Sequence, residues 1–328
     1  MNKVAFFDCK PYDREWFNKI NEKYGFDIVY FENKLNESTA LMAKDFEAAV
    51  AFVNDQINQS TINTLYSGGT RLLAMRCTGY SNVDLKAAKD KISVVRVPDY
   101  SPYSVAEYAI ALLLCINRKI HKAYNRTRDM NFSIDGLMGF DLYGKTLGVI
   151  GTGKIGKVFI NICKGFGLNV IAYDPYPSDK GNISYVSKEE VFSRSDIISL
   201  HCPLTHDNHY IINKESIEMM KKGVYIINTS RGGLINSEDL LEYLLNGKIG
   251  GAALDVYEEE SEIFFEDFSD SIMKDNVLTH LLSLPNVLIT SHQAFFTSEA
   301  MFDIVSVTLN NIYEYFNNKR IVNEIRYK

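Results

Sequence analysis

The 328-residue sequence has no long apolar run, no cluster of Lys and Arg, and no closely spaced pair of cysteines. The lack of a long apolar run argues against a membrane span, and Asp8 and Lys10 interrupt the region that a signal peptide would need to be apolar. A net charge of −6 without a basic run disfavours nucleic acid and anionic membranes as partners. Five cysteines without a C-x-x-C pair predict neither a disulfide framework nor a zinc knuckle. We therefore expect a soluble, cytoplasmic protein that binds a small molecule.

The length predicts two domains of roughly 150 residues each. Short apolar runs alternate with amphipathic segments from the start of the chain, which is typical of a parallel sheet covered by helices. The strands predicted in the first part are 4–7, 27–31, 48–53, 72–75 and 92–97, and the helices are 13–23, 37–44 and 83–89.

A second alternating series follows a long predicted helix, 103 to about 129, which Ser101 would cap and Pro102 would open. Its predicted strands are 147–150, 169–173, 197–200, 224–228, 251–254 and 287–290. A last helix is predicted at 298–317, but periodicity does not say on which domain it packs. The expected fold class is α/β, with two domains built on parallel sheets.

The second series begins with a dinucleotide-binding fingerprint, G-x-G-x-x-G, between a strand and a helix. Gly151 would allow the tight turn, Gly153 the approach of a pyrophosphate, and Gly156 the close packing of helix on strand. Asp174 ends the next strand, where an acid accepts hydrogen bonds from ribose hydroxyls and repels a 2′-phosphate. An ordinary βα turn could also use these glycines, but the strand, the spacing and the acid together favour NAD over NADP.

Polar residues that suit the reduction of a 2-oxo acid follow three of the later strands. Arg231 offers a planar cation for a carboxylate, His292 a proton donor, and Glu260 a partner for that donor. Asp255 ends the strand before Glu260. Because ligands bind at the carboxyl ends of parallel strands, these residues are expected at one crevice. Taken singly, they could be a surface ion pair, solvated acids and a buried histidine.

Two segments invite a metal interpretation. The run from His201 to His209 holds three histidines and Cys202, but its spacing fits no zinc-finger or H-x-x-x-H pattern, so a turn over the cofactor is favoured. The acidic stretch 258–275 lacks the alternating acids of a calcium loop and is interpreted as a solvated loop. No metal is expected.

With these residues assembled, the whole chain resembles the D-2-hydroxyacid dehydrogenase family, and within it the fermentative NAD-dependent D-lactate branch. The matching motifs are Arg76-Cys-Thr-Gly79, Asn82-Val-Asp84-Leu, Val97-Pro-Asp-Tyr100-Ser-Pro, Gly148-Val-Ile-Gly-Thr-Gly-Lys-Ile-Gly156, Ser199-Leu-His-Cys-Pro203, Asn228-Thr-Ser-Arg231-Gly-Gly, Asp255-Val-Tyr-Glu, Phe264-Phe-Glu-Asp267 and His292-Gln-Ala.

The resemblance implies two Rossmann-like domains: a substrate domain formed by residues 1–99 and the C-terminal helix 298–328, and an NAD-binding domain at 100–297 between them. It implies that Arg231 clamps the substrate, that His292 donates the proton, and that Glu260 supports His292. The implied substrate contacts are Phe52, Thr78, Gly79, Tyr100, Arg231 and Phe295. The implied cofactor contacts are Gly151, Gly153, Lys154, Ile155, Gly156, Asp174, Cys202, Pro203, Asn208, Thr229, Ser230 and Asp255.

The implied activity is reversible hydride transfer from NADH to pyruvate, giving D-lactate, by a homo-oligomer such as a dimer. Two alternatives stay open: a D-2-hydroxyisocaproate type of dehydrogenase with a wider pocket, and a non-enzymatic NAD-sensing corepressor or scaffold. The chain departs from many relatives at Tyr108 and Asn236, where only local packing is expected to change.

Overall fold

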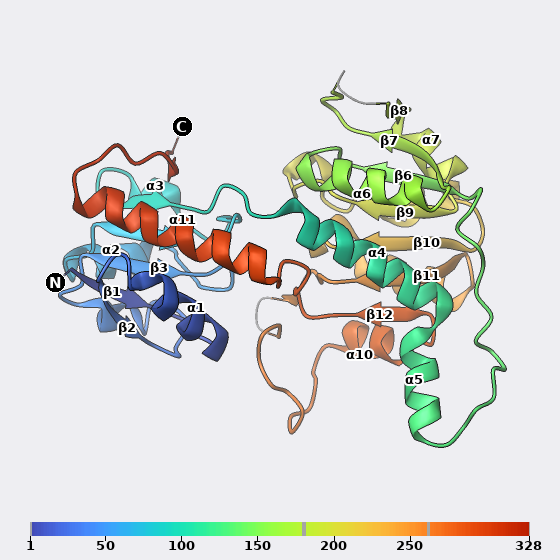
Figure 1. Cartoon of the computed structure of the whole chain (residues 1–328), viewed down its shortest axis with the longest axis horizontal. Coiled ribbons are helices and arrows are strands. Elements are labelled where there is room, and N and C mark those ends of the chain that lie inside the picture. The colour runs from blue at the N-terminus through green and yellow to red at the C-terminus, as the bar shows by residue number, and fades with distance from the viewer. Residues whose placement is uncertain (1, 179–181, 261–262, 328) are drawn as a thin grey trace. The chain divides into compact units, whose positions relative to one another are not determined.

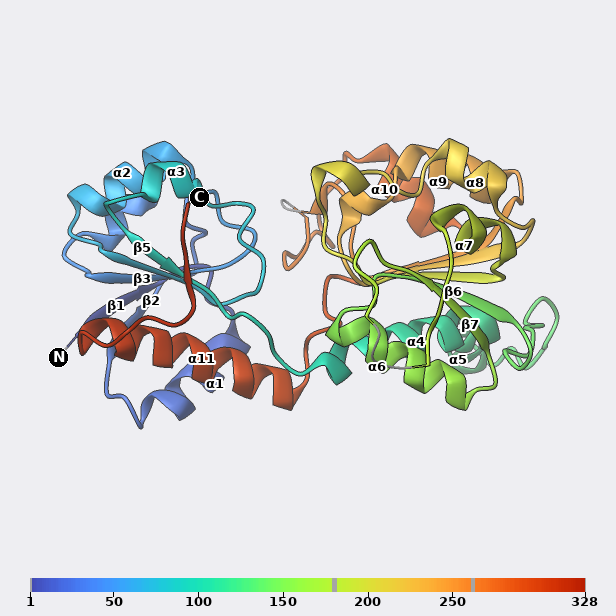
Figure 2. The ribbon, with the colours of Figure 1, turned by 90° about the horizontal axis from the view of Figure 1, so that it is seen from above.

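The computed structural model describes residues 2–178, 182–260 and 263–327. The chain forms two compact units: Met1–Ser101 with Phe296–Lys328, and Pro102–Phe295. The sequence-based boundaries, after residues 99 and 297, lie close to these. Each unit is a sheet with helices on both faces (Figures 1 and 2).

The first unit contains a six-stranded sheet in the order β13-β5-β4-β3-β1-β2. Five of its strands are parallel, and the short β13 pairs with β5 in the antiparallel sense, which the sequence did not indicate. The strands are β1 (Lys3–Phe6), β2 (Asp27–Tyr30), β3 (Ala48–Ala51), β4 (Leu72–Met75), β5 (Ser93–Val95) and β13 (Glu324–Ile325). The C-terminal helix therefore returns to this unit together with the last strand.

Helices α1 (Pro11–Asn21) and α11 (Ser298–Phe316) cover one face of this sheet, and α2 (Gln59–Ser67) and α3 (Leu85–Ala88) cover the other (Figure 2). The prediction of an α-helix at 37–44 was wrong, because the structure has only a 3-10 turn, η1 (Ala40–Ala43). The Asn36 side chain accepts hydrogen bonds from the backbone N–H groups of Ser38 and Thr39, and this local bonding competes with a helix. Helix α2 was not predicted.

The second unit contains a seven-stranded, all-parallel sheet in the order β12-β11-β10-β9-β6-β7-β8. The strands are β6 (Thr146–Ile150), β7 (Asn169–Tyr173), β8 (Ser184–Tyr185), β9 (Ile197–Leu200), β10 (Val224–Asn228), β11 (Ile249–Leu254) and β12 (Val287–Ile289). All except the short β8 match predicted strands closely.

Helices α4 (Pro102–Arg118), α5 (Ile120–Arg128) and α6 (Lys154–Gly165) lie on one face of this sheet. The other face carries α7 (Lys188–Arg194), α8 (Lys214–Met219), α9 (Ser237–Leu245) and α10 (Asn276–Ser283) (Figure 2). Buried apolar side chains form two core clusters in this unit. None of the described helices is long and apolar enough to cross a membrane.

The long helix predicted from 103 to 129 is interrupted. Lys119 adopts a left-handed conformation with φ of 51° and separates α4 from α5. Its ammonium donates to the Gly136 carbonyl, and the neighbouring Asn117 side chain is bonded to the backbone of Phe140 at both its oxygen and its nitrogen. The segment has neither Pro nor Gly, so the break depends on these contacts with a distant loop, and the local sequence does not signal it.

The chain order reverses at β6, which lies between β7 and β9. From there β7 and β8 extend the sheet in one direction, and β9 to β12 extend it in the other. In a parallel sheet, ligands bind at the carboxyl ends of the strands beside such a reversal. The loops after β6, β9, β10, β11 and β12 all lie along this edge.

Candidate functional site

The turn between β6 and α6 can be built only with glycine at two positions. Gly151 has φ of +96°, and a Cβ there would lie 2.6 Å from the His201 carbonyl carbon, which follows β9. A Cβ on Gly156 would lie 2.2 Å from the carbonyl oxygen of Gly151. At Gly153 a Cβ would meet no atom within 4 Å, so this position faces open space at the start of α6. The roles expected of Gly151 and Gly156 therefore have a steric basis, and Gly153 leaves room for a ligand.

Asp174, at the end of β7, has a structural role that the sequence did not reveal. Its Oδ2 accepts hydrogen bonds from the backbone N–H and the hydroxyl of Thr152, at 2.7 and 2.9 Å. Its Oδ1 accepts from the Tyr176 N–H at 2.9 Å. A carboxylate has about four acceptor positions, so this partly exposed group keeps capacity for a ribose hydroxyl. Thr152, which orients Asp174, lies between the first two glycines of the fingerprint. This position in the motif is the sequence feature from which its contact with Asp174 could have been predicted.

The loops after β9 and β10 are tied together. The Ser230 hydroxyl donates to the Cys202 carbonyl at 2.5 Å, and the Asn208 amide donates to the Pro203 carbonyl at 2.7 Å. Burial raises the pKa of the Cys202 thiol to about 11, so this cysteine is not a reactive thiolate. The Thr229 hydroxyl is buried and has no hydrogen-bond partner among the described residues.

These features fit a dinucleotide. Glycine caps α6, so no side chain blocks the helix N-terminus, where backbone N–H groups favour phosphate. The open position at Gly153 and the unpaired hydroxyl of Thr229 are explained if a polar cofactor lies along this edge.

Asp255 holds the loop that carries His292. Its carboxylate is fully buried and accepts from the Thr290 hydroxyl at 2.6 Å and from the backbone N–H groups of Gln293 and Ala294 at 3.0 and 2.8 Å. Its carbonyl accepts from the His292 N–H at 2.7 Å. These bonds maintain the left-handed backbone of His292, whose φ is 52°. Burial raises the pKa of Asp255, and the three donors oppose that shift.

The structure brings His292 and Glu260 together, as their residue types suggested. The Nδ1 of His292 lies 2.7 Å from Oε1 of Glu260, and the two side chains are only 19% and 15% exposed. The second oxygen of Glu260 accepts from the Tyr257 N–H at 2.8 Å, which turns the carboxylate toward the histidine. Because a carboxylate only accepts hydrogen bonds, Nδ1 carries the proton. The ring of Phe265 lies 6.2 Å from the His292 ring, centroid to centroid.

Arg231 follows β10 on the same edge of the sheet. Its Nη1 donates to the Ser230 carbonyl at 2.6 Å, and its own carbonyl accepts from the Asn228 side chain at 2.8 Å. A Cβ on the next residue, Gly232, would lie 2.0 Å from the carbonyl carbon of Tyr257. This contact places the Arg231 loop against the segment that leads to Glu260. No hydrogen bond joins the Arg231 guanidinium to Glu260 or His292 in the described structure.

The other expected substrate residues are divided between the units. Phe52, Thr78, Gly79 and Tyr100 belong to the first unit, and Phe295 ends the second. The carbonyl of Thr78 accepts from Arg96, and the carbonyl of Gly79 accepts from the Cys77 thiol.

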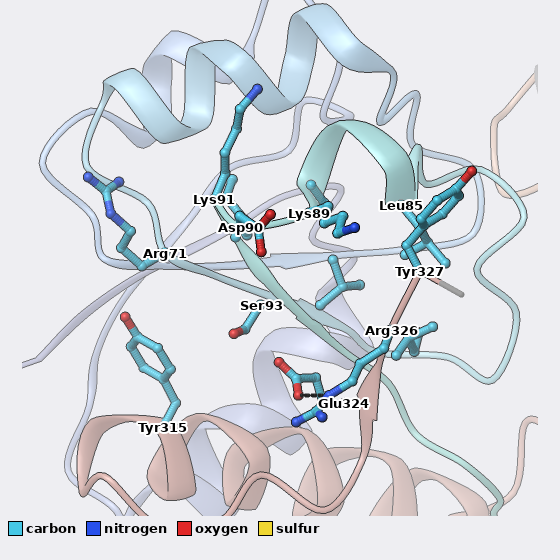
Figure 3. Close-up of a pocket in the computed structure, with 14 residues that line it drawn as sticks. Arg71, Leu85, Lys89, Asp90, Lys91, Ser93, Tyr315, Glu324, Arg326 and Tyr327 are labelled. Carbon is cyan, nitrogen blue, oxygen red and sulfur yellow. Dashed lines mark hydrogen bonds and ion pairs between the residues drawn. The ribbon is translucent and has the colours of Figure 1, made fainter.

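A pocket of about 550 Å³ lies in the first unit at the other edge of its sheet. Its lining includes Arg71 and Ser93, at the amino ends of β4 and β5, and Tyr315 on α11 (Figure 3). Phe52 and Thr78 follow the carboxyl ends of β3 and β4. This pocket therefore lies at the opposite edge of the sheet from the expected substrate residues, and it is not the proposed substrate site.

Burial accounts for parts of the two segments that invited a metal interpretation. The Nε2 of partly buried His201 lies 2.8 Å from the Ser199 hydroxyl, and desolvation lowers the pKa of His201 to about 3, while the His206 side chain is exposed. Among the described residues, no group of three or more His, Cys, Asp or Glu could hold a metal ion. The solvated-loop interpretation of 258–275 was wrong in part, because Phe264 is buried in the apolar core of the second unit.

Comparison with known proteins agrees with this geometry. Residues 110–294 match the NAD-binding domain of the D-isomer specific 2-hydroxyacid dehydrogenases. The chain is 48% identical to the D-lactate dehydrogenase of Escherichia coli over 94% of this chain and 95% of that relative. A structure of the pyruvate reductase of Chlamydomonas reinhardtii superposes with a TM-score of 0.93 at 41% identity, covering 98% of both chains. A structure of a D-2-hydroxyisocaproate dehydrogenase has a TM-score of 0.87 at 31% identity, covering 99% of this chain and all of that one.

The chain therefore belongs to the D-isomer specific 2-hydroxyacid dehydrogenase family, and its second unit contains the NAD-binding domain.

Replacing Asp255 by Asn tests the hydrogen bonds that hold the His292 loop. One oxygen would remain, but the amide NH₂ would face the N–H of Ala294, leaving a buried donor unpaired at a cost of about 1–3 kcal/mol. Amide hydrogen exchange of the 290–295 segment should accelerate roughly tenfold, which corresponds to about 1.4 kcal/mol. Thr290→Val removes only the hydroxyl donor and should leave the exchange close to wild type. Unchanged protection in the Asp255 variant would contradict this role.

Proposed function

We propose that this protein is a D-lactate dehydrogenase that reversibly reduces pyruvate to D-lactate with NADH. The observation that carries the proposal is the 2.7 Å pair of His292 and Glu260 on the carboxyl edge of the nucleotide-binding sheet. Membership of the family and the 48% identity to the Escherichia coli D-lactate dehydrogenase support it.

The NAD cofactor supplies or accepts the hydride when it is bound. The chain's part is to hold it, and the residues proposed to do so line the carboxyl edge of the second unit: Gly151, Gly153, Lys154, Ile155, Gly156, Asp174, Cys202, Pro203, Asn208, Thr229, Ser230 and Asp255. Asp174 supports a preference for NAD over NADP, because its carboxylate would repel a 2′-phosphate. Asp255 is proposed to act on the cofactor less directly than the other residues of this set, because its buried carboxylate already accepts three hydrogen bonds.

His292 is proposed as the proton donor. With Nδ1–H directed to Glu260, Nε2 is the ring nitrogen left to protonate the oxygen that forms on the 2-carbon. The negative charge of Glu260, 2.7 Å from Nδ1, is proposed to stabilise the imidazolium form of the donor. Arg231 is proposed to bind the substrate carboxylate, for which its planar, bidentate group is suited. In the oxidation direction, neutral His292 accepts the proton.

The substrate-contacting set is proposed to include Phe52, Thr78, Gly79, Tyr100 and Phe295 together with Arg231. Aromatic rings in this set would limit the size of the acid, which favours pyruvate. The alternative substrate is a longer, branched 2-oxo acid, and the structural likeness to a D-2-hydroxyisocaproate dehydrogenase keeps that alternative open.

The proposal predicts the outcome of a substrate panel. Oxidation of NADH should be most efficient with pyruvate, less efficient with its longer, branched homologue 2-oxoisocaproate, and the product should be the D isomer. Initial rates over a range of concentrations and chiral chromatography of the product measure both. Higher efficiency with 2-oxoisocaproate would support the alternative, and no NADH oxidation with any 2-oxo acid would contradict enzymatic function.

Glu260→Gln tests the proton donor. Glutamine keeps the size and a hydrogen bond but removes the charge that stabilises imidazolium. The pH above which pyruvate reduction declines should therefore move to a lower value, while His292→Ala should abolish most turnover at every pH. Profiles of kcat/KM against pH, with isotope effects on hydride transfer, provide the measurement.

Arg231→Lys serves as the matched control for this profile. It leaves Glu260 and His292 in place but removes the bidentate group, so KM for pyruvate should rise while the high-pH limb stays where it is in wild type. An unshifted limb in Glu260→Gln would rule out that the charge of Glu260 supports His292 in proton transfer. A loss of NADH affinity alone in Arg231→Lys would mean that Arg231 does not bind the substrate.

A homo-oligomer is also proposed, with a second copy covering an exposed apolar strip in the second unit. Met130, Phe132, Ile134 and Met138 are all largely exposed in the loop after α5. Several large apolar side chains exposed within one short loop are unusual on the surface of a monomer. Light scattering should give at least the mass of a dimer, and Phe132→Asp with Ile134→Asp should lower it. A wild-type monomer would contradict this proposal.

We also propose that the protein acts in the cytoplasm. The five cysteines are thiols and not disulfides in the structure, which is in keeping with a reducing compartment. Cell fractionation would test this location.

A further inference from the structure

A buried group of charges lies beside Phe52 in the first unit, and none of the proposed catalytic steps uses it. Arg76 follows β4 and is only 3% exposed. Asp8, after β1, and Asp13, in α1, are buried beside it. Taking several charges out of water is costly, and buried ion pairs are often no more stabilising than apolar residues of similar size. Stability alone is therefore a weak explanation for this cluster.

The sheet order explains how these residues meet. Strand β3 lies between β4 and β1, and Phe52 follows β3. Arg76 extends past the end of β3, where its Nη2 donates to the Asp8 carbonyl at 2.9 Å. Its Nη1 lies 3.3 Å from Oδ1 of Asp13, and its Nη2 lies 3.9 Å from Oδ2 of Asp8. The guanidinium is thus held between two carboxylates.

The central carbon of this guanidinium lies over the ring of Phe52. The distance from the Arg76 Cζ to the ring centroid is 4.0 Å, which is within the range of a cation–π contact. Burial by itself would lower the pKa of Arg76, but Asp13, Tyr12 and Asp8 raise it overall, so the group stays charged. The buried Nε has no hydrogen-bond partner among the described residues. The guanidinium is therefore oriented for the stack rather than for the largest number of hydrogen bonds.

The backbone of Phe52 is fixed as well. Its N–H donates to Oδ2 of Asp55 at 2.6 Å, and its carbonyl accepts from the Asn82 amide at 2.9 Å. The other oxygen of Asp55 accepts from the Leu35 N–H at 2.7 Å. With both backbone groups held, the remaining freedom is rotation of the ring, and Arg76 covers one face of that ring.

We propose that Arg76 is a positioning residue that holds the Phe52 ring in one orientation and thereby limits the size of the 2-oxo acid that is accepted. The inference rests on the proposed function, in which Phe52 contacts the substrate. Asp8 and Asp13 act through Arg76 by fixing its guanidinium.

Arg76→Lys tests this role, because it keeps the charge for Asp8 and Asp13 but removes the planar face. The ratio of kcat/KM for pyruvate to that for 2-oxoisocaproate should fall about fivefold, which corresponds to about 1 kcal/mol. The change should appear in KM rather than in kcat for pyruvate, and the dissociation constant of NADH should stay as in wild type. If Arg76 had a purely structural role, Arg76→Lys would lower the amount of active enzyme and leave the ratio of kcat/KM values unchanged.

Arg71→Lys is the matched control. Arg71 precedes the same strand, β4, and stacks on the Tyr66 ring at 4.1 Å, but it lies at the opposite edge of the sheet, beside the pocket of Figure 3. The same substitution there should leave the substrate ratio unchanged. An equal fall in both variants would overturn the proposal.

Phe52→Leu separates failure of this inference from failure of the proposed function. If Phe52→Leu does not change the ratio, Phe52 does not contact the substrate, and that part of the proposed function fails. If it lowers the ratio, Arg76→Lys should add little in the Phe52→Leu background, because both act through one ring. Full additivity, or no effect of Arg76→Lys alone, would overturn the role of Arg76 and leave the role of Phe52 intact.

Asp13→Asn provides the test if Arg76→Lys does not fold. This substitution removes the charge that holds Nη1 of Arg76, so the substrate ratio should fall. An unchanged ratio would overturn the proposal.

Discussion

The close approach of the loops after β6 and β9 is the constraint on which the nucleotide-binding edge depends. Gly151 and His201 are so near that a single Cβ would occupy the same space as the His201 carbonyl. This contact lies where the strand order reverses, and it brings the start of α6 to the carboxyl edge of the sheet. The loops after β10, β11 and β12 extend the same edge. The strand order alone therefore places Arg231, Asp255 and His292 there, independently of contacts between their side chains.

Carboxylates that are buried or partly buried then determine the local geometry at strand ends in both units. Asp174 organises the fingerprint turn, Asp255 the His292 loop, and Asp55 the backbone at Phe52. Each accepts hydrogen bonds from backbone N–H groups that would otherwise be buried without partners. Burial raises the pKa of Asp55 to about 7 and also raises that of Asp255, which reflects the energetic cost of these arrangements. In both units, a carboxylate fixes backbone next to a ring-bearing residue: Asp255 holds the loop of His292 in the second unit, and Asp55 holds the backbone of Phe52 in the first.

Much of this fold could be predicted from the pattern of the sequence. The strands β4, β7, β9 and β10 match the predicted ranges, because buried parallel strands are short, apolar and bounded by turn residues. Two helical predictions failed because hydrophobic periodicity does not include side-chain hydrogen bonds to the backbone. Lys119 breaks the long helix through contacts with residues 136–140, and Asn36 replaces a helix by side-chain hydrogen bonds. The short strands β8 and β13 carry too few residues for any periodicity to be visible.

For the candidate site, residue types and their positions after strands were enough to select Arg231, Glu260 and His292, and the fingerprint was enough to indicate a dinucleotide. The amino-acid sequence by itself determined these because they depend on chemistry and on short-range spacing. Only the tertiary structure decided that Glu260 meets His292, that Asp255 is buried under the His292 loop, and that Arg76 stacks on Phe52. Those contacts join residues that are distant in sequence, and their distances follow from sheet order and packing, which no local pattern encodes.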